Sequence, residues 1–487
     1  MNNKLKNQIF SGLIWKFGER FLAQGVSFVI SVILSRLLTP NDYGIVAMIL
    51  IFINIANVFV TSGFSTALVQ NKDADDVDFS TNFFCSLAMS IVVCIIMYFV
   101  APVIANFYKL PELTLIIRVF SLRIPLSAFS AIQHAYVERY MLFKRYFYST
   151  LTGTLFSGII GIIFAYKGYG VWALIAQYFT NTILDIVVLL FTIEWRPKFV
   201  FSKKSALTMI DYGSKILLAD LSGTFFNELR SLIIGKIYTS SDLAFYNKGN
   251  QLPNLITINV TSSIMTVLFP AISNINDDSD RVVELTKKST KIIAYIIMPM
   301  LLLMACISKS LVIILFTSKW IDVVPYIQLL SIACAIGMIG SVSLQTIKAV
   351  GRSDIVLKLE FIKKPIYIFL LLLGAIISPI AIAITMLLYN IYSTIVNAFE
   401  LSKVISYPLS EQLLDLSGTF AMSMIMCIFI YPLSFLNLNN YLIIFLQISI
   451  GILVYWILSI ILKNESYIVL KKMIGEVLYA QKNGSIN

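Results

Sequence analysis

A short stretch of the sequence places one arginine and three other polar residues on a single helix face inside an apolar run. Arg123, Ser127, Ser130 and His134 occur at i, i+4, i+7 and i+11, the spacing that aligns side chains along one side of an α-helix. A guanidinium can hold a phosphate through two parallel hydrogen bonds, and this contact strengthens where water competes poorly. The pattern therefore predicts an anion-binding site at Arg123, beside a helix kink at Pro125.

Less specific interpretations of the same residues stay open. Arg123 could form a structural ion pair with a carboxylate, and Glu19 and Asp220 are the two candidates. His134 is the only histidine of the chain, and it could be a polar packing residue as well as a proton relay.

Further charged and polar residues lie within apolar runs, where each charge costs roughly 2.5–3.5 kcal/mol at a helix centre on insertion scales and is usually retained for a purpose. Carboxylates that could couple transport to a proton or a sodium ion are Glu19, Asp185, Asp220 and Glu228. Polar residues that could line a lumen are Gln24, Asn54, Asn57, Asn227, Asn254 and Thr257. Helix packing through interhelical hydrogen bonds is the alternative for each of them.

The elements that must position these residues are membrane helices. Hydrophobic residues make up 58% of the 487 residues and charged residues 13%, compared with about 25% charged residues in a typical soluble domain. A barrel would need short alternating segments, whereas the apolar runs here are long and continuous. We therefore predict an all-α polytopic membrane protein with about fourteen spans. The predicted spans are residues 11–35, 44–69, 81–106, 113–136, 147–166, 171–193, 208–236, 249–273, 289–312, 323–347, 355–377, 379–402, 413–434 and 440–462.

The positions of lysine and arginine predict the orientation of the chain. An even number of spans places both termini on one side of the membrane, and the basic segments 139–145, 196–204 and 281–288 fall on that same side. Because short basic loops face the cytoplasm, we expect both termini in the cytoplasm.

Composition also argues against other classes of protein. The net charge of +11 could suggest a nucleic-acid partner, but the basic residues lie between apolar runs, where membrane topology explains them. The five cysteines lack CxxC spacing and histidine neighbours, so we expect small buried side chains rather than a metal site or disulfides. We infer no cofactor and no nucleic acid.

The sequence also repeats itself at an offset of 200 residues. The segments SRLLTPNDYG at 35–44 and GKIYTSSDLA at 235–244 each follow an apolar run. An even number of spans separates them, so both copies have the same orientation, as in transporters built from parallel repeats. Matching pairs are Ser31 and Ser231, Arg36 and Lys236, Thr39 and Thr239, Asp42 and Asp242, Asn54 and Asn254, Asn57 and Thr257, and Thr61 and Thr261.

The repeat predicts two pseudosymmetric six-helix lobes with a polar lumen between them. We place the N-terminal lobe at 1–195, a cytoplasmic linker at 196–205, and the C-terminal lobe at 206–405. Two further helices and a cytoplasmic tail follow at 406–487.

Several segments, taken together, resemble the Wzx-type polysaccharide repeat-unit flippases, and more narrowly the branch associated with colanic acid and teichuronic acid export. The resemblance runs from about residue 5 to 405. Its segments are RLLTPNDYG after the first span, GYGVWALIAQY at 168–178, YGSKILLADL at 212–221, LAFYNKGNQLP at 243–253, VLFPAIS at 267–273 and KAVGRSDIVLKLEFIKK at 348–364.

The resemblance implies a member of the multidrug/oligosaccharidyl-lipid/polysaccharide exporter superfamily, with the two lobes in a V and two extra C-terminal helices. Such proteins move undecaprenyl-diphosphate-linked oligosaccharide to the outer leaflet of the bacterial cell membrane by alternating access, and act beside polymerase and export machinery. Cationic lumen residues are thought to receive the diphosphate. By position these would be Arg20, Arg118, Arg123, Lys215 and Arg230.

Three other functions stay open as alternatives. A cation-coupled drug antiporter of the same fold would need acidic lumen residues to dominate, and the cationic excess argues against it. A lipid II flippase is a second relative, distinguishable by arrest of wall synthesis after depletion. A polysaccharide polymerase or ligase would carry a long extracytoplasmic loop with catalytic arginine or histidine, and no such loop occurs here; we therefore do not expect an enzyme.

Overall fold

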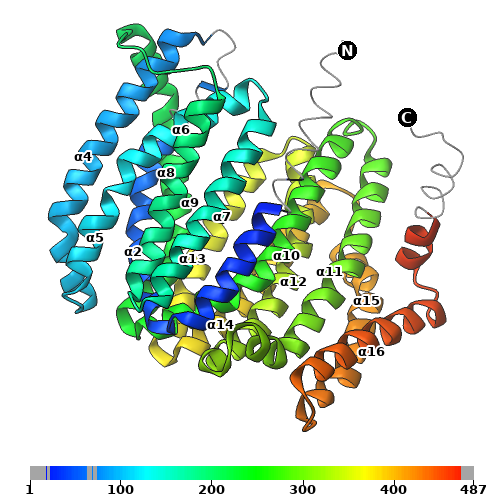
Figure 1. Cartoon of the computed structure of the whole chain (residues 1–487). Helices are drawn as coiled ribbons and strands as arrows, with labels where there is room; N and C mark the ends of the chain where they lie inside the picture. Colours follow the sequence, from blue (N-terminus) through cyan, green and yellow to red (C-terminus); the bar gives the residue numbers. More distant parts are fainter. Residues whose placement is uncertain (1–17, 19–21, 63–67, 70–73, 473–487) are drawn as a thin grey trace, which may run out of the picture. The chain divides into compact units, whose positions relative to one another are not determined.

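The computed structural model describes residues 18, 22–62, 68–69 and 74–472, and these residues form helices joined by short turns, with no strand among them (Figure 1). The prediction of an all-α polytopic membrane protein is confirmed. The chain divides into two compact units, residues 1–244 and 245–487. The lobe boundaries drawn from the sequence stay a prediction.

Within the described residues, the first unit contains a helix at each of the predicted spans one to seven, with the fourth span split in two. Its helices are Leu22–Leu37, α2 (Pro40–Thr61), α4 (Asp76–Tyr108), α5 (Leu113–Ser121), α6 (Arg123–Arg139), α7 (Phe143–Tyr166), α8 (Val171–Thr192) and α9 (Lys203–Ile237). The first turn of α10 (Ser240–Ser273) also belongs to this unit.

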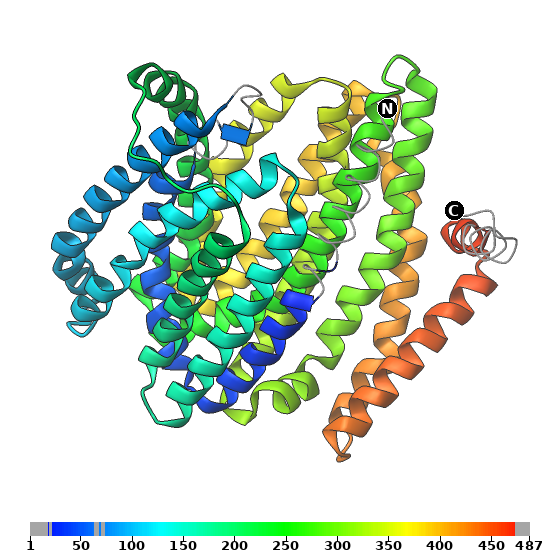
Figure 2. The ribbon, with the colours of Figure 1, turned by 45° about the horizontal axis from the view of Figure 1, so that its top comes forward.

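The second unit continues from α10 and holds the remaining spans. Its other helices include α11 (Ser279–Phe316), the 3-10 helix η1 (Ser318–Val323), α12 (Val324–Ala349), α13 (Ser353–Ile377), α14 (Pro379–Val404), α15 (Leu409–Ile430), η2 (Tyr431–Phe435) and α16 (Asn440–Ile461), and residues 465–472 are also helical. In Figures 1 and 2, α15 and α16 lie side by side.

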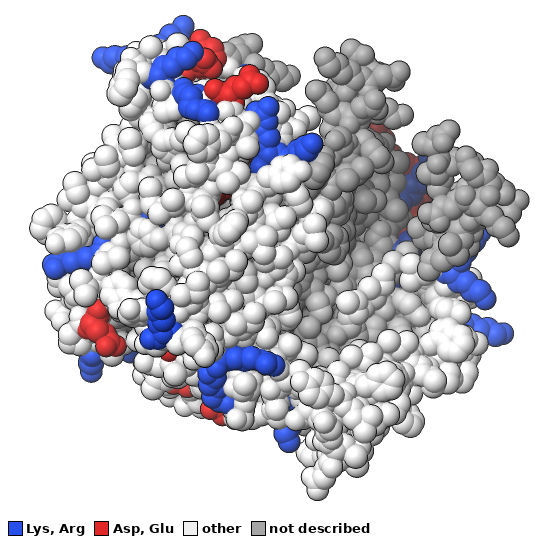
Figure 3. All heavy atoms as spheres, in the orientation of Figure 1, with Lys and Arg blue, Asp and Glu red and all other residues white. Residues whose placement is uncertain are grey.

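Ten helical segments of the described chain are long and apolar enough to cross a membrane. The helices α9, α10 and α13 have 35, 34 and 25 residues, which also exceeds the about twenty residues that a span requires, but they carry more polar and charged residues. In the space-filling view, most charged side chains seen on the first unit gather toward the two ends of its helices, and the surface between them in this view is mostly uncharged (Figure 3).

Small residues allow the helices of the first unit to pack closely. The hairpin of α7 and α8 is the most extensive contact of the unit. A Cβ at Gly153 would lie 3.4 Å from the Asn181 side chain, and one at Gly161 would lie 3.1 Å from Gln177. Such small residues are typical of helix interfaces in membranes, where association depends on close packing. The helix α6 packs against α8, α2 and α4, so one face of α6 is held against α8.

The fourth span is interrupted at Leu122, which separates α5 from α6. Proline cannot donate the backbone hydrogen bond to the residue four positions earlier, and Pro125 lies three residues after the interruption. The interruption lies beside the proline at which the sequence predicts a kink, and it makes Arg123 the first residue of α6.

The repeated sequence forms the same local structure twice. Thr39 Oγ1 accepts a hydrogen bond from the Asp42 backbone at 3.3 Å, and Asp42 Oδ2 accepts from the Thr39 backbone at 2.9 Å. Thr239 and Asp242 repeat this reciprocal cap at 3.1 and 3.0 Å. Each cap satisfies backbone donors at the start of a helix.

The two copies of the cap also meet. A Cβ at Gly44 would lie 1.8 Å from the backbone oxygen of Ser240, and the Ser240 hydroxyl is hydrogen bonded to Asn41 Oδ1. The segments 40–44 and 239–242 therefore pack backbone against backbone within the first unit.

In the second unit, α15 is tied to α11 by ion pairs near Asp415. This carboxylate lies 3.0 Å from Lys291 and 3.5 Å from Lys287, and it accepts a hydrogen bond from the Tyr407 hydroxyl at 2.8 Å. Burial and the adjacent Asp415 raise the pKa of Tyr407, so its hydroxyl remains a donor.

Candidate functional site

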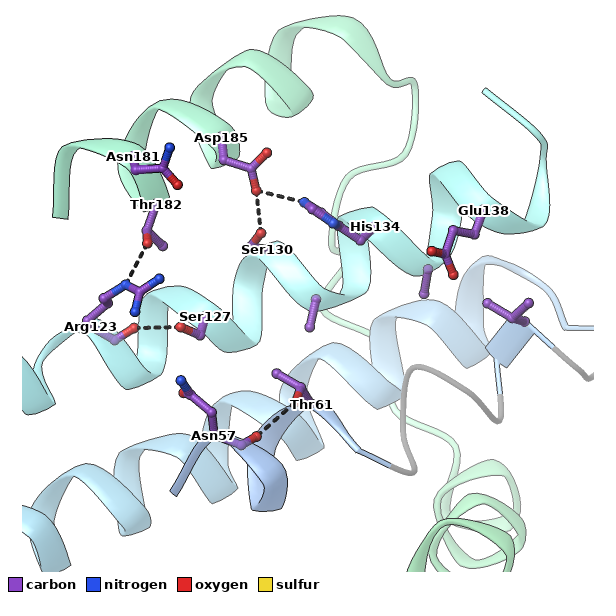
Figure 4. Close-up of a pocket in the computed structure, with 13 residues that line it drawn as sticks. Asn57, Thr61, Arg123, Ser127, Ser130, His134, Glu138, Asn181, Thr182 and Asp185 are labelled. Carbon is purple, nitrogen blue, oxygen red and sulfur yellow. Dashed lines mark hydrogen bonds and ion pairs between the residues drawn. The ribbon is translucent and has the colours of Figure 1, made fainter. Parts of the chain in front are cut away.

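A cavity of about 580 Å³ lies among α2, α6 and α8 of the first unit (Figure 4). Its wall follows the polar face of α6 that the sequence predicts. The lining residues are Asn57, Thr61, Val69, Arg123, Ser127, Ser130, Ala131, His134, Ala135, Glu138, Asn181, Thr182 and Asp185.

Arg123 lies at one end of this cavity and is half-buried. Its Nε donates to Thr182 Oγ1 at 2.8 Å, and the guanidinium lies 5.3 Å from the ring centre of Tyr178. These contacts fix the plane of the guanidinium, as Figure 4 shows for Thr182. No described residue accepts a hydrogen bond from its two Nη nitrogens or forms an ion pair with it, so Asp220 is not its partner in the described part of the chain.

Asp185 is the centre of a second polar cluster in the same cavity. Its Oδ2 accepts from Ser130 Oγ at 2.5 Å and contacts His134 Nε2 at 2.7 Å, and its Oδ1 accepts from Ser149 Oγ. The side chains of His134 and Asp185 are 29% and 15% exposed, so water can still reach the pair. Three donors from α6 and α7 thus hold one carboxylate of α8 at the cavity wall.

The remaining cavity wall offers uncharged hydrogen-bonding groups and one more carboxylate. Asn57 Oδ1 is buried and has no hydrogen-bond partner within the described chain. Glu138 is exposed and forms no ion pair with another described residue. The charged groups that line the cavity are therefore Arg123, Asp185 and Glu138, with His134 as the group that can change its charge.

A third cluster joins α2 to α9 outside the lining of this cavity. Asn54 Nδ2 donates to Glu228 Oε1 at 2.8 Å, so a predicted lumen residue meets a predicted ion-coupling carboxylate. Arg230 lies two residues further along α9 and is partly buried, whereas Asn227 is exposed.

The other predicted site residues lie elsewhere. Arg118 donates from Nε to the Tyr98 backbone oxygen at 3.3 Å and lies over the Tyr98 ring, on α4 and away from the cavity lining. Lys215, Asp220 and Gln24 are exposed. Arg20 and Glu19 lie outside the described residues.

Two predicted lumen residues belong to the second unit. Thr257 is buried and donates to the Pro253 backbone oxygen at 2.8 Å, and Asn254 Oδ1 lies 3.9 Å from the sulfur of Cys334. A lumen shared between the two halves stays a prediction.

Sequence reasoning missed the cavity residues contributed by α8 other than Asp185. Asn181 and Asp185 are four residues apart and Thr182 lies between them, so a polar stripe in the sixth span could have indicated this face. Ser149 gave no such signal, because its hydroxyl reaches Asp185 only through the packing of α7 on α8.

Comparison with known proteins places the chain among proteins of surface polysaccharide synthesis. A family described as polysaccharide biosynthesis protein matches residues 33–325, which is more than half of the chain. The succinoglycan biosynthesis transport protein ExoT of Rhizobium meliloti is 24% identical over 331 residues, covering 68% of this chain and 67% of that protein. The lipopolysaccharide biosynthesis protein WzxC of Escherichia coli is 22% identical over 407 residues, 82% of each chain. The teichuronic acid biosynthesis protein TuaB of Bacillus subtilis is 22% identical over 360 residues, 72% of this chain and 73% of that protein.

Solved structures share the fold. The lipid II flippase MurJ in an inward closed conformation matches with a TM-score of 0.73 at 17% identity, over 93% of this chain and 98% of MurJ. An inward-facing multidrug resistance transporter of the MATE family, from the MOP superfamily, matches with a TM-score of 0.61 at 14% identity, over 81% of this chain and 98% of the transporter. The resemblance to Wzx-type proteins of this superfamily, drawn from the sequence, is confirmed by these matches, and the chain belongs to the polysaccharide biosynthesis protein family.

Proposed function

We propose that the protein is a flippase that carries undecaprenyl-diphosphate-linked oligosaccharide repeat units from the inner to the outer leaflet of a bacterial cell membrane, with its termini in the cytoplasm. The family, the transport and polysaccharide names of its relatives and the flippase fold support this proposal. The protein needs no covalent chemistry for this task and works beside the polymerase and export machinery.

The physical problem in this reaction is the polar headgroup. A diphosphate and its sugars lose their hydration in hydrocarbon, and an unpaired charge there is very unfavourable. A polar cavity within the helices replaces the lost water contacts, while the polyprenyl chain remains in lipid. The cavity of the first unit provides hydroxyl, amide and guanidinium groups among membrane helices, together with the carboxylates of Asp185 and Glu138.

The observation that carries the proposal is the set of contacts that the Arg123 guanidinium makes. Its guanidinium is positioned by Thr182 and Tyr178, and both Nη nitrogens are without a described acceptor. A positioned guanidinium with open donors is suited to hold two oxygens of one phosphate. The ion pair that would give Arg123 a purely structural role is not present among the described residues.

The test replaces Arg123 with Gln in a strain that lacks its own copy of the gene. We expect surface polysaccharide to fall about 10-fold to 100-fold, because a hydrogen bond to a charged group contributes about 1.5–3 kcal/mol. Lipid-linked repeat units should accumulate in the inner leaflet. Arg123→Lys keeps the charge but loses the two-pronged geometry, so it should restore only part of the function.

Arg118→Gln is the matched comparison, since it removes an arginine of the same span that contacts Tyr98 rather than the cavity. We expect it to keep most of the export at equal abundance in the membrane. Equal losses in both variants would contradict the assignment of the cavity. Growth arrest with intact surface polysaccharide after depletion would instead indicate transport of a cell-wall precursor.

A further inference from the structure

The cavity contains a pair of titratable groups that binding of a phosphate through Arg123 does not require. His134 and Asp185 face each other at 2.7 Å across the contact between α6 and α8. Ser130 and Ser149 donate to the same carboxylate, so its position is fixed independently of the imidazole. Figure 4 shows Asp185, Ser130 and His134 converging on one point of the wall, on the same side of α6 as Arg123. A carboxylate held by hydroxyl donors can keep its place while the imidazole gains or loses a proton.

We propose that His134, held by Asp185, is a proton site linked to substrate binding, so that the cavity takes up a proton when the diphosphate of the substrate enters. This inference rests on the proposed function and adds the coupling ion and its position. Asp185 acts as the positioning residue of the imidazole and does not itself contact the substrate.

The charge balance of the cavity gives the physical reason. With a neutral imidazole, the lining carries one positive charge at Arg123 and two negative charges at Asp185 and Glu138. This net negative charge opposes the entry of a diphosphate. Protonation of His134 brings the lining to neutrality, and binding of an anion therefore favours the protonated form. Linkage requires the converse, that the proton favours binding of the anion by the same factor.

Other charged and titratable groups near the pair fit this assignment. On α6, Glu138 lies one turn after His134 and Arg123 lies three turns before it. On α7, the Tyr146 ring packs edge-on against the imidazole at 4.9 Å between ring centres. Lys144 and Arg145 begin the same helix, and Arg145 lies 4.0 Å from Glu194. From α2, the described cavity lining receives the neutral side chains of Asn57 and Thr61, and Val69 further along the chain is apolar.

The size of the effect follows from geometry. Arg123 and His134 are eleven residues apart on one helix, about 16 Å at 1.5 Å per residue. At that separation each unit of charge on a phosphate bound at Arg123 changes the protonation equilibrium of the imidazole roughly fivefold, for an effective dielectric constant of about 20. An imidazole titrates in the range from about pH 5 to pH 8, where such a change alters binding.

The experiment measures binding of undecaprenyl diphosphate, without sugars, to the full-length protein in nanodiscs of zwitterionic lipid at pH 6 and pH 8. For the native protein we expect tighter binding at pH 6. His134→Gln should remove most of this difference while keeping a side chain that can donate to Asp185. Any titration of the diphosphate itself is common to all variants, so the comparison between the native protein and His134→Gln isolates the imidazole.

A second measurement needs no variant. His134 is the only histidine. In protein with isotope-labelled histidine, the NMR signal of this one imidazole therefore reports its protonation state. Addition of undecaprenyl diphosphate at pH 7 should move this signal toward the protonated form, and calorimetry in buffers of different ionisation enthalpy should detect proton uptake.

The outcomes separate this inference from the proposed function. Arg123→Gln should weaken binding of the lipid at both pH values and leave the ratio of the two affinities unchanged. The native protein and His134→Gln could both bind the lipid with the same change in affinity between pH 6 and pH 8, or binding could depend on sodium ions without proton uptake. In either case the proton site is wrong and the flippase proposal stands. If the native protein does not bind the lipid at either pH, the proposed function itself is contradicted.

Discussion

Replacement of Gly44 by alanine tests whether the two copies of the repeated cap pack as the structure shows. The added methyl carbon would lie 1.8 Å from the Ser240 backbone oxygen, 2.3 Å from its carbonyl carbon and 2.9 Å from its Cα. All three atoms belong to the backbone, so no side-chain rotation can relieve the overlap. The start of α2 must move away from the turn between α9 and α10.

The magnitude combines three effects. Overpacking at a close contact costs about 1–3 kcal/mol, and separation of the segments also strains the hydrogen bond between Ser240 and Asn41, which contributes about 1 kcal/mol. Alanine favours a helix over glycine by about 1 kcal/mol, which offsets part of the loss. We expect a net loss of about 1–3 kcal/mol in the free energy of unfolding.

The measurement is thermal denaturation of the purified protein in detergent, followed by the loss of monodisperse protein in size-exclusion chromatography. Gly223→Ala is the control, because Gly223 lies within α9 and a Cβ there meets no atom of the described chain within 4 Å. We expect the melting temperature to fall for Gly44→Ala and to stay equal or rise for Gly223→Ala. Equal melting temperatures for the two variants would refute the close contact of segments 40–44 and 239–242.

Two further predictions concern stability. Thr39→Val and Thr239→Val each remove a hydroxyl from one copy of the cap. Each should lower the free energy of unfolding by about 1 kcal/mol. A much larger effect of one variant than of the other in thermal denaturation would show that the two copies are not equivalent. Asp415→Asn removes the common partner of Lys287, Lys291 and the Tyr407 hydroxyl. It should lower the free energy of unfolding by about 2 kcal/mol, in the range for a hydrogen bond to a charged group, because Lys287 and Lys291 keep Glu411 and Glu465 as partners. Glu284→Gln breaks only the exposed pair with Lys288 and should lower the melting temperature little in the same assay, so similar losses from both variants would contradict a special role for Asp415.

Hydropathy and helical spacing were enough to predict the helices and one wall of the cavity. A helix at each predicted span from the second to the fourteenth follows from long apolar runs, since backbone polar groups in a membrane must be satisfied within the helix. The stripe Arg123, Ser127, Ser130 and His134 lines one wall because side chains at these spacings share a helix face whatever surrounds it. The repeated caps form because threonine and aspartate three residues apart satisfy their own backbone donors.

Pairing between helices could not be predicted in this way. The stripe does not say that α8 faces it, that Thr182 positions Arg123, or that Ser149 reaches Asp185 from a third helix. Arg118 illustrates the same limit, because it is charged and lies in the same span as Arg123, yet it packs on Tyr98 of α4.

The sequence by itself determined the class of protein, the places of its helices and the polar face of α6, because these depend on interactions between residues close in the chain. The tertiary structure decided which polar residues meet, with contacts such as Asp185 to His134 spanning 51 positions of sequence. Such contacts depend on how closely particular helices approach one another, which small residues at the interface allow. The helices that meet are far apart in the sequence, so their packing is defined only in the folded protein.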